Sequence, residues 1–300
     1  MTHRKKSMSI VITAASGRLG RIVIEDLLAS GVPARDITAV ARTEDKVADL
    51  VAKGVRRHLA DYDRPETFAG LFQPGDRVLL IPGGDAGRRV TQHEAVLDAA
   101  RKAEVAQLAY VGAFGGPKAD FLLAADHRET ERLILDSGLP YTFLRNNWYS
   151  EVYAGDIGDL AGVLERGVVV TNVAPGSRIA TAPRRDYGLA AAAVLLQDGH
   201  LGQAYELSGD TAWTFEEFAA EVSRQSGKEV VHTCLPAAER KALLVSFGLP
   251  DGFAETLVDV DEAISRGALA GTPGDLSRLI GRPTTPIADT IADGLAALPR

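Results

Sequence analysis

The chain contains almost no cysteine and has no excess of positive charge. Cys234 is the single cysteine among 300 residues, which excludes an internal disulfide and an all-cysteine metal site. We expect Cys234 to be a buried thiol and the protein to be cytoplasmic, where thiols stay reduced. The net charge of −7 argues against nucleic acid as a direct partner, because proteins that bind nucleic acids present a basic face.

The sequence also has no long hydrophobic run. No segment approaches the roughly 20 consecutive apolar residues of a membrane-spanning helix, so no membrane partner is expected. The basic segment Met1–Ser7 is not followed by such a run, and we expect it to be a flexible extension rather than a signal peptide. His93 and His127 share no ligand spacing with nearby Cys, Asp or His residues. We therefore expect no metal site.

The first half of the chain alternates β-rich runs with helical patterns. Leu19, Ile22, Val23 and Leu27, for example, repeat at helical spacing. Such alternation requires parallel strands with right-handed crossovers. We therefore predict an α/β fold with a Rossmann-type doubly wound parallel sheet. The expected strands are Ser9–Thr13, Ile37–Ala41, Arg56–Leu59, Arg77–Ile81, Gln107–Val111 and Tyr141–Leu144, and the expected helices include Glu44–Lys53, Pro65–Phe72, Thr91–Ala103 and Leu122–Ser137.

After about Arg145 helical stretches dominate, and short β runs interrupt them. We interpret this half as a smaller C-terminal α/β substrate lobe. The expected division is residues 1–7 as the extension, 8–150 as the NAD(P)-binding domain and 151–300 as the substrate lobe, with the chain free to cross between lobes. Asp186 is expected to cap the N-terminus of a helix. The β runs are Val168–Asn172, Ala204–Leu207 and Val230–Thr233, and the helices are Glu151–Arg166, Arg185–Gln197, Thr214–Gln225, Ala237–Phe247 and Ala254–Arg266.

The stretch VITAASGRLG links the first strand to the first helix and is typical of a dinucleotide-binding turn. Gly17 and Gly20 stand three residues apart, as a phosphate-binding loop requires. Ala14 occupies the position at which a third glycine is usual. An alanine there costs on the order of 1 kcal/mol if its φ is positive. We expect a negative φ at Ala14 and therefore retained dinucleotide binding.

The end of the second expected strand indicates which dinucleotide is bound. Enzymes that use NAD place Asp or Glu there to bind the ribose 2′-hydroxyl. This chain has Arg42 at that position, with Lys46 one helical turn later and Arg18 inside the glycine loop. Cations of this kind suit a 2′-phosphate, although solvated surface charge is the alternative. We predict NADP(H) in preference to NAD(H).

The tyrosine–lysine pair used by carbonyl-reducing dehydrogenases of this fold is missing. None of the seven tyrosines has Lys four residues later, and the nearest case is Tyr141 with Arg145. After the fifth expected strand the chain has Gly112 and no Ser. Positioned acid catalysis supplies about 10²- to 10⁴-fold in rate. The sequence therefore favours a small aromatic acceptor that accepts hydride readily, such as a quinone or a cationic dye.

Several runs resemble the NmrA-like atypical short-chain dehydrogenase/reductase family over nearly the whole chain from Met8. They are ITAASGRLG, ADY at Ala60–Tyr62, AADHRETERLILDSGLPYTFLRNNWYSE at Ala124–Glu151, YELSGDTAWTFEEFA and LIGRPTTP. Within the family, the chain is similar to bacterial type-2 NADPH quinone oxidoreductases and to triphenylmethane reductases. The resemblance implies an NADP(H)-binding lobe and direct hydride transfer without flavin or metal. The sequence of this chain departs from the family's usual GATGxxG loop at Ala14.

The resemblance also implies the site residues. The implied cofactor-binding residues lie in the glycine loop and at the ends of the following strands. They are Ala14, Ala15, Ser16, Gly17, Arg18, Leu19, Gly20, Arg42, Lys46, Asp61, Tyr62, Ile81, Pro82, Gly83, Tyr110 and Gly112.

Other candidates follow the fifth and sixth expected strands. His127 aligns near a catalytic lysine of plant relatives and is a candidate to donate a hydrogen bond to ribose or substrate, the alternative being a packing histidine. Asn146 is a second candidate catalytic residue, because its amide can hydrogen-bond a quinone oxygen. Phe114, Asn147, Trp148 and Tyr149 are candidate substrate-binding residues, the alternative being packing side chains at a hinge.

Two functions remain open from the sequence. The first is an NADPH-dependent reductase of quinones or quinone-like and triarylmethane compounds. The second is an NmrA-like sensor that binds NADP(H) and regulates a partner with little turnover. The missing tyrosine–lysine pair is compatible with both. The protein is expected to be a monomer or a homodimer.

Overall fold

The computed structural model describes residues 9–84, 87–156 and 159–298, so the expected extension Met1–Ser7 lies outside the described residues. The chain forms two compact units and crosses between them repeatedly. The first unit comprises Met1–Gly112, Asp126–Arg145 and Tyr187–Tyr205, and the second comprises Ala113–Ala125, Asn146–Asp186 and Glu206–Arg300.

The central element of the first unit is a seven-stranded parallel sheet. The predicted Rossmann-type fold is confirmed. The strand order switches direction between β1 and β4, which pair with each other, and ligands in such folds lie at that point, beyond the carboxyl ends of the strands. The run Ala204–Leu207, grouped with the second half in the sequence analysis, belongs to this sheet as its seventh strand. In spatial order the strands are β3 (Arg56–Leu59), β2 (Ile37–Ala41), β1 (Ile10–Ile12), β4 (Arg77–Leu80), β5 (Gln107–Ala113), β6 (Tyr141–Asn146) and β9 (Gln203–Leu207).

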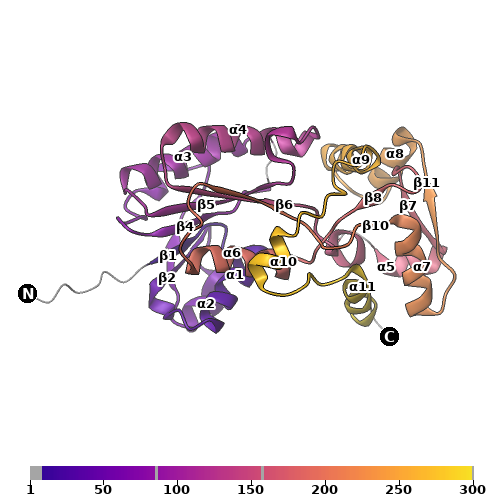
Figure 1. Ribbon diagram of the computed structural model, residues 1–300, viewed down its shortest axis with the longest axis horizontal. Coiled ribbons are helices and arrows are strands. Elements are labelled where there is room, and N and C mark those ends of the chain that lie inside the picture. Colours follow the sequence, from indigo (N-terminus) through magenta and orange to yellow (C-terminus); the bar gives the residue numbers. More distant parts are fainter. Residues whose placement is uncertain (1–8, 85–86, 157–158, 299–300) are drawn as a thin grey trace, which may run out of the picture. The chain divides into compact units, whose positions relative to one another are not determined.

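Helices cover both faces of the sheet, which is why its central strands are buried throughout and mostly apolar. Two helices, α3 and α4, lie on one face, and α1, α2 and α6 lie on the other (Figure 1). A Cβ at Gly188 of α6 would lie 2.4 Å from the Ile22 side chain of α1, so glycine is what allows these two helices to approach. The bounds are α1 (Arg18–Ala29), α2 (Ala48–Ala52), α3 (Arg89–Lys102), α4 (Leu122–Ser137) and α6 (Arg184–Leu196).

Two expected helices of the first unit are shorter than predicted. Only Ala48–Ala52 of the predicted Glu44–Lys53 helix is α-helical, after a 3₁₀ turn at Asp45–Val47. The predicted helix at Pro65–Phe72 is a single 3₁₀ turn, Pro65–Phe68. Both carry too few apolar positions to form a face that packs over several turns.

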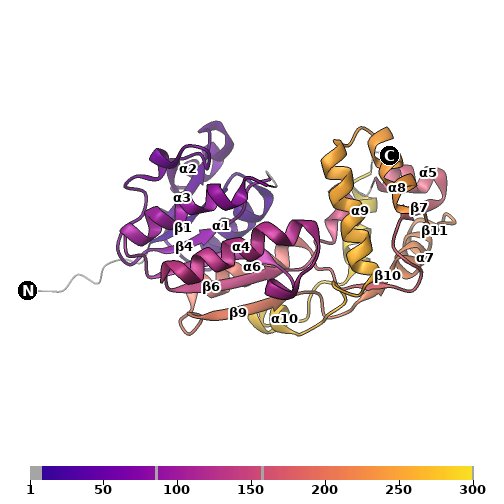
Figure 2. The ribbon, with the colours of Figure 1, turned by 90° about the horizontal axis from the view of Figure 1, so that it is seen from above.

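The second unit is built from helices around two small strand pairs. Figure 2 shows α8 and α9 side by side. Helix α7 begins with a capping box between Thr214 and Glu217. The strand pairs are β7 (Val168–Thr171) with β11 (Val231–Cys234), parallel, and β8 (Arg178–Ile179) with β10 (Trp213–Thr214), antiparallel. The helices are α5 (Leu160–Arg166), α7 (Phe215–Ser226), α8 (Ala237–Ser246), α9 (Asp251–Ser265), α10 (Asp275–Ile280) and α11 (Ile287–Ala296), with a π-helical turn at Val152–Asp156.

Three expectations fail in the second unit. The predicted helix Glu151–Arg166 is divided into the π-helical turn Val152–Asp156 and α5, and Asp159 before α5 has a left-handed conformation. Cys234 is exposed rather than buried, because it ends β11, a strand with an exposed outer face.

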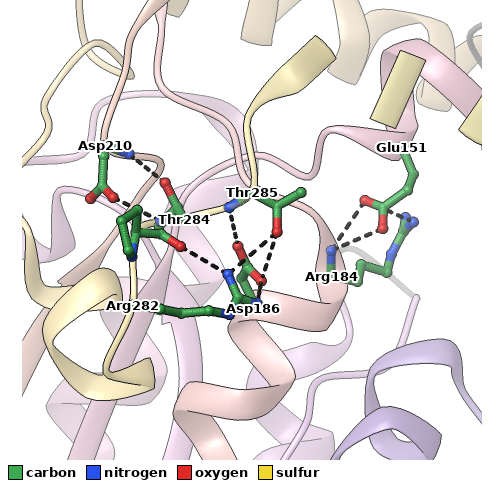
Figure 3. Close-up of polar contacts among 8 residues, drawn as sticks. Glu151, Arg184, Asp186, Asp210, Arg282, Thr284 and Thr285 are labelled. Atoms are coloured by element: carbon green, nitrogen blue, oxygen red, sulfur yellow. Dashed lines mark hydrogen bonds and ion pairs between the residues drawn. The ribbon is translucent and has the colours of Figure 1, made fainter. Parts of the chain in front are cut away.

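Asp186 is the third residue of α6 rather than its cap. Its fully buried carboxylate accepts hydrogen bonds from Arg282 Nη2 at 2.6 Å and from the Thr285 backbone N–H at 2.7 Å (Figure 3). It therefore holds the segment before α11 in place.

A second contact in Figure 3 holds the same segment. Asp210 and Thr284 exchange two hydrogen bonds of 2.8 Å, each backbone N–H donating to the other residue's side-chain oxygen. Nearby, the Glu151 carboxylate accepts a hydrogen bond from the Arg184 backbone N–H at 2.9 Å, at the start of α6. The polar groups of this cluster bind one another, so its role is structural.

Candidate functional site

A cleft of about 360 Å³ lies beside the glycine loop in the first unit. It brings together many of the residues that the sequence analysis assigned to cofactor binding. The end of β2 lines it, and so does the glycine loop, in which Gly17 is the N-cap of α1 without a side-chain hydrogen bond. The lining residues predicted from the sequence are Ala14, Ser16, Gly17, Arg42, Asp61, Tyr62, Pro82 and Gly83.

The glycine loop is tightly packed, and Ala14 adopts a left-handed conformation. Its φ is +47°, so the expected negative φ is wrong. The turn requires this geometry because the Ala14 carbonyl accepts a hydrogen bond from the Gly17 N–H at 2.9 Å. A Cβ at Gly20 would lie 2.8 Å from that carbonyl and 2.8 Å from Ala15 Cα, so position 20 admits only glycine.

A buried hydroxyl network fixes the loop against the neighbouring strand. Thr13 Oγ1 accepts a hydrogen bond from the Ile81 N–H at 3.0 Å and donates one to the Leu79 carbonyl at 3.1 Å. The Tyr62 hydroxyl lies 2.7 Å from Thr13 Oγ1 and 2.7 Å from the Ile81 carbonyl, and burial raises its pKa. Tyr62 therefore shapes the cleft wall as a neutral phenol. Sequence reasoning did not identify Thr13, although a polar residue ending an apolar strand was a usable signal.

Of the three cationic side chains predicted to bind the cofactor, Arg42 stands at the rim of this cleft. Arg42 follows β2 directly, lines the cleft and is exposed. Within the residues that the structure describes, its guanidinium makes no hydrogen bond or ion pair. Arg18 and Lys46 are also exposed, but neither lines the cleft. Ala15 and Leu19 are buried beneath the loop.

A buried arginine supports the opposite side of the cleft. Arg89 in α3 donates from Nε to the Gly83 carbonyl at 2.9 Å, and its Nη1 lies 3.9 Å from the Asp126 carboxylate. Gln92, one turn later, lines the cleft and donates to Asp63 at 2.8 Å. Sequence reasoning missed Arg89, because a single arginine at a helix start carries no signal of burial.

The candidate residues on β5 and α4 point into the core of the first unit. Tyr110 is fully buried, and its hydroxyl lies 2.8 Å from Nδ1 of His127. Burial, reinforced by the charge of Arg89, lowers the pKa of His127 to about 3, so the imidazole is neutral. Gly112 is also buried, and a Cβ there would lie 3.2 Å from the Glu131 carboxylate.

The remaining candidates belong to the second unit. Asn147 is buried and bonded on both sides: its amide donates to the Leu269 carbonyl at 3.0 Å and accepts from the Trp148 N–H at 2.7 Å. Asn146 has a buried Oδ1 without a hydrogen bond to any described residue, while its Nδ2 makes only a 3.4 Å contact with the Tyr149 hydroxyl.

The aromatic candidates of the second unit differ in their surroundings. The Tyr149 ring lies under the Arg184 guanidinium at 4.6 Å, and burial raises its pKa. Phe114 is buried, in the core cluster of the unit. Trp148 lines a cavity of about 740 Å³. Sequence reasoning missed this cavity and its polar residues, Arg240 and Asp261. An aspartate on the apolar face of α9, between Val260 and Ile264, was the available signal.

No group of three or more His, Cys, Asp or Glu residues among the described ones is arranged to hold a metal ion. Among the described helices, none is both long and apolar enough to cross a bilayer.

Comparison with known proteins places this geometry in a family. Residues 14–171 match the NAD(P)H-binding family. Quinone oxidoreductase 2 of Escherichia coli is 42% identical over 283 residues, which cover 94% of this chain and 97% of that protein. The crystal structure of that species' NADPH-dependent quinone oxidoreductase with NADPH superimposes with a TM-score of 0.90, covering 95% and 99% of the two chains.

A second solved structure agrees with the first. Triphenylmethane reductase of Citrobacter sp. is 37% identical, covers 96% of this chain and 100% of its own, and has a TM-score of 0.90. The fold is therefore that of known nucleotide-dependent reductases. The chain belongs to the NAD(P)H-binding, NmrA-like family.

Proposed function

We propose that the protein is an NADPH-dependent reductase that transfers hydride directly to quinones, or to quinone-like and triarylmethane acceptors. The observation that carries this proposal is the cleft in which the glycine loop, Arg42 and the Pro82–Gly84 segment meet. The full-length similarity to reductases named for quinones and for triphenylmethane compounds supports the acceptor class.

The residues of the cleft fit an NADPH molecule in three places. The backbone N–H groups at the start of α1 suit a pyrophosphate, because no side chain among the described residues caps them and the helix dipole favours an anion there. Arg42 is available to donate paired hydrogen bonds to a 2′-phosphate. Gly83 leaves space beside Tyr62, where a Cβ would already be at 3.6 Å. When bound, NADPH supplies the hydride.

The first unit's buried groups do not replace the missing tyrosine–lysine pair. His127 and Tyr110 bind each other in the core, and neither is an acid with a pKa near neutral pH. We therefore propose that the acceptor itself is strongly electrophilic and that solvent supplies the proton. Asn146 is the better of the two candidate catalytic residues, since its amide retains hydrogen-bonding capacity.

The cofactor assignment is tested by an Arg42→Asp variant with Arg35→Asp as the matched control, because Arg35 is exposed and lies outside the cleft. A charge-assisted hydrogen bond contributes about 1.5–3 kcal/mol. The ratio of NADPH to NADH affinity should therefore fall about tenfold to a hundredfold in Arg42→Asp and stay unchanged in the control. Calorimetric titration measures it. An unchanged ratio in Arg42→Asp would refute the assignment.

A regulatory function is the alternative, favoured by the missing tyrosine–lysine pair. Purified protein is mixed with NADPH and a panel of quinones and cationic triarylmethane dyes, and the loss of NADPH absorbance is followed. Oxidation of NADPH that depends on the acceptor supports the reductase. Tight NADPH binding without oxidation above background supports an NADP(H) sensor.

A further inference from the structure

The second unit contains a cavity of about 740 Å³ whose walls are largely aromatic and aliphatic. Its volume lies within the usual range for small-molecule sites. Phe215 and Phe218 of α7 form one wall, and Trp148 stands at another. Phe247 and Phe253 also line it and are 54% and 43% exposed, so the cavity opens to solvent between apolar side chains. Such walls suit a flat ring with an apolar substituent.

Two ion pairs line these walls: Arg166 with Asp159, whose side chains are exposed, and Arg240 with Asp261, whose side chains are largely buried. Arg240 of α8 and Asp261 of α9 both line the cavity, with 3.9 Å between Arg240 Nε and Asp261 Oδ2. Asp261 also accepts a hydrogen bond from the Asn172 N–H at 3.0 Å. The Arg240 guanidinium makes no hydrogen bond to any residue in the described part of the chain, and its Nε is fully buried. A buried donor without an acceptor is costly, so Arg240 Nε is placed to donate to an acceptor atom that enters the cavity.

The charges of Arg240 and Asp261 determine which hydrogen-bond acceptor fits beside them. Asp261 already balances Arg240, and it is deeply buried. A second anion beside them would leave an uncompensated negative charge among apolar walls. A neutral carbonyl oxygen satisfies the guanidinium without that cost. Tyr153, on the π-helical turn, also lines the cavity, and its ring packs on Trp213 and Phe215.

We propose that this cavity binds the acceptor as a neutral quinone with an apolar side chain, its carbonyl oxygen accepting hydrogen bonds from Arg240 and its side chain lying among the phenylalanines. The inference rests on the proposed function, which supplies the quinone. It adds that, among quinones, the protein selects substituted and uncharged ones, and that Arg240 is the residue that recognises the quinone oxygen.

Binding can be measured without NADPH, using the full chain's own fluorescence. The chain has two tryptophans: Trp148 lines the cavity, and Trp213 packs on Phe218, which also lines it. The probes are 1,4-naphthoquinones with 2-alkyl chains of increasing length, and one with a ring sulfonate. Each buried methylene should lower the Kd roughly fourfold, and the sulfonate should bind more weakly than the methyl compound.

Arg240→Met keeps the aliphatic stem and removes the donors. The Kd for the alkyl quinones should rise about tenfold or more, while Arg266→Met, an exposed arginine outside the cavity, should leave it unchanged. If Arg240→Met does not fold, Val170→Phe narrows the cavity from a half-buried position and should weaken the long-chain compounds most.

Three outcomes would overturn the inference: affinity independent of chain length, tighter binding of the sulfonate, or unchanged binding in a folded Arg240→Met. None of them touches the proposed function, which stands on NADPH oxidation by the wild-type protein. Conversely, the absence of NADPH oxidation would leave these binding measurements intact.

Discussion

The two units treat their buried polar side chains differently. In the first unit most of them bind one another: Tyr110 pairs with His127 at 2.8 Å, and the Glu131 carboxylate accepts two hydrogen bonds from Arg145, at 2.9 and 2.7 Å. In the cavity of the second unit, Arg240 keeps its donors without a hydrogen bond in the described structure. The first arrangement rigidifies a scaffold, and the second leaves hydrogen-bonding capacity for a ligand.

The largest expected effect on stability comes from removing one partner of the buried Glu131–Arg145 ion pair in the first unit. Glu131 is 3% exposed, and Glu131→Ala leaves the Arg145 charge largely buried without its carboxylate. We expect a loss of about 3–5 kcal/mol in the free energy of unfolding, measured by chemical denaturation. The control is Glu129→Ala on the same helix, whose partner Arg132 is exposed, and it should change stability little. Equal losses in the two variants would contradict the comparison.

Acidification should weaken the first unit through its neutral histidines. Burial lowers the pKa of both His93 and His127 to about 3, below the ordinary value near 6.5. The stability they contribute is therefore present above pH 6.5 and is lost as the pH falls toward 3. Between pH 7 and 5 the loss should be about 2 kcal/mol for each histidine.

Hydrogen exchange of the β1 and β5 amides reports on the first unit. The double variant His93→Gln/His127→Gln should show a smaller decrease in protection between pH 7 and 5, after correction for intrinsic exchange. If wild type and variant respond to pH alike, the histidines are not held neutral by the fold.

The cavity pair should respond to pH in the opposite direction. Burial raises the pKa of Asp261 from its ordinary value of 3.8 to about 6. The stabilising contribution of Asp261 is therefore fully present below pH 3.8 and is lost as the pH rises through 6. Going from pH 7.5 to 5 should restore about 1 kcal/mol to the second unit. Tryptophan fluorescence during denaturation follows this unit, because Trp148 and Trp213 both belong to it. Asp261→Asn should abolish the restored stability, and a wild-type unit that weakens on acidification would contradict the assignment.

Sequence patterns predicted the scaffold well because apolar periodicity dictates it. The strands Ile37–Ala41 and Arg56–Leu59 and the helix Leu122–Ser137 were predicted with their observed bounds. The cleft beside the glycine loop also brings together residues that the sequence analysis grouped, since they are neighbours along the strand ends. The cavity could not be predicted in the same way. Arg240 and Asp261 lie on separate helices, and only tertiary packing brings them within 3.9 Å.

The sequence also did not reveal which residues have left-handed backbone conformations. Substitutions at these residues give the smallest expected effect on stability in the comparison of the two units. Each unit has a non-glycine residue with positive φ near a helix start: Ala14 at +47° in the first and Asp159 at +36° in the second. Asp159 uses this conformation, because its carboxylate accepts a hydrogen bond from the Gly162 N–H at 3.0 Å and caps α5. Ala14 has no such side chain, so its strain is uncompensated.

Ala14→Gly should therefore stabilise the first unit, while Asp159→Gly should bring the second unit no gain, because relief of strain is offset by loss of the cap. Glycine relieves roughly 1 kcal/mol of strain at position 14 and returns part of it as entropy of the unfolded chain, leaving a gain of about 0.5 kcal/mol. Hydrogen exchange of the β1 amides measures the stability of the first unit in Ala14→Gly. Tryptophan fluorescence during denaturation measures the stability of the second unit in Asp159→Gly. Calorimetry should show tighter NADPH binding to Ala14→Gly, because the loop then reaches its turn without strain. If both variants gained stability equally, the Asp159 side chain would not stabilise α5, and the contrast drawn between the two loops would be wrong.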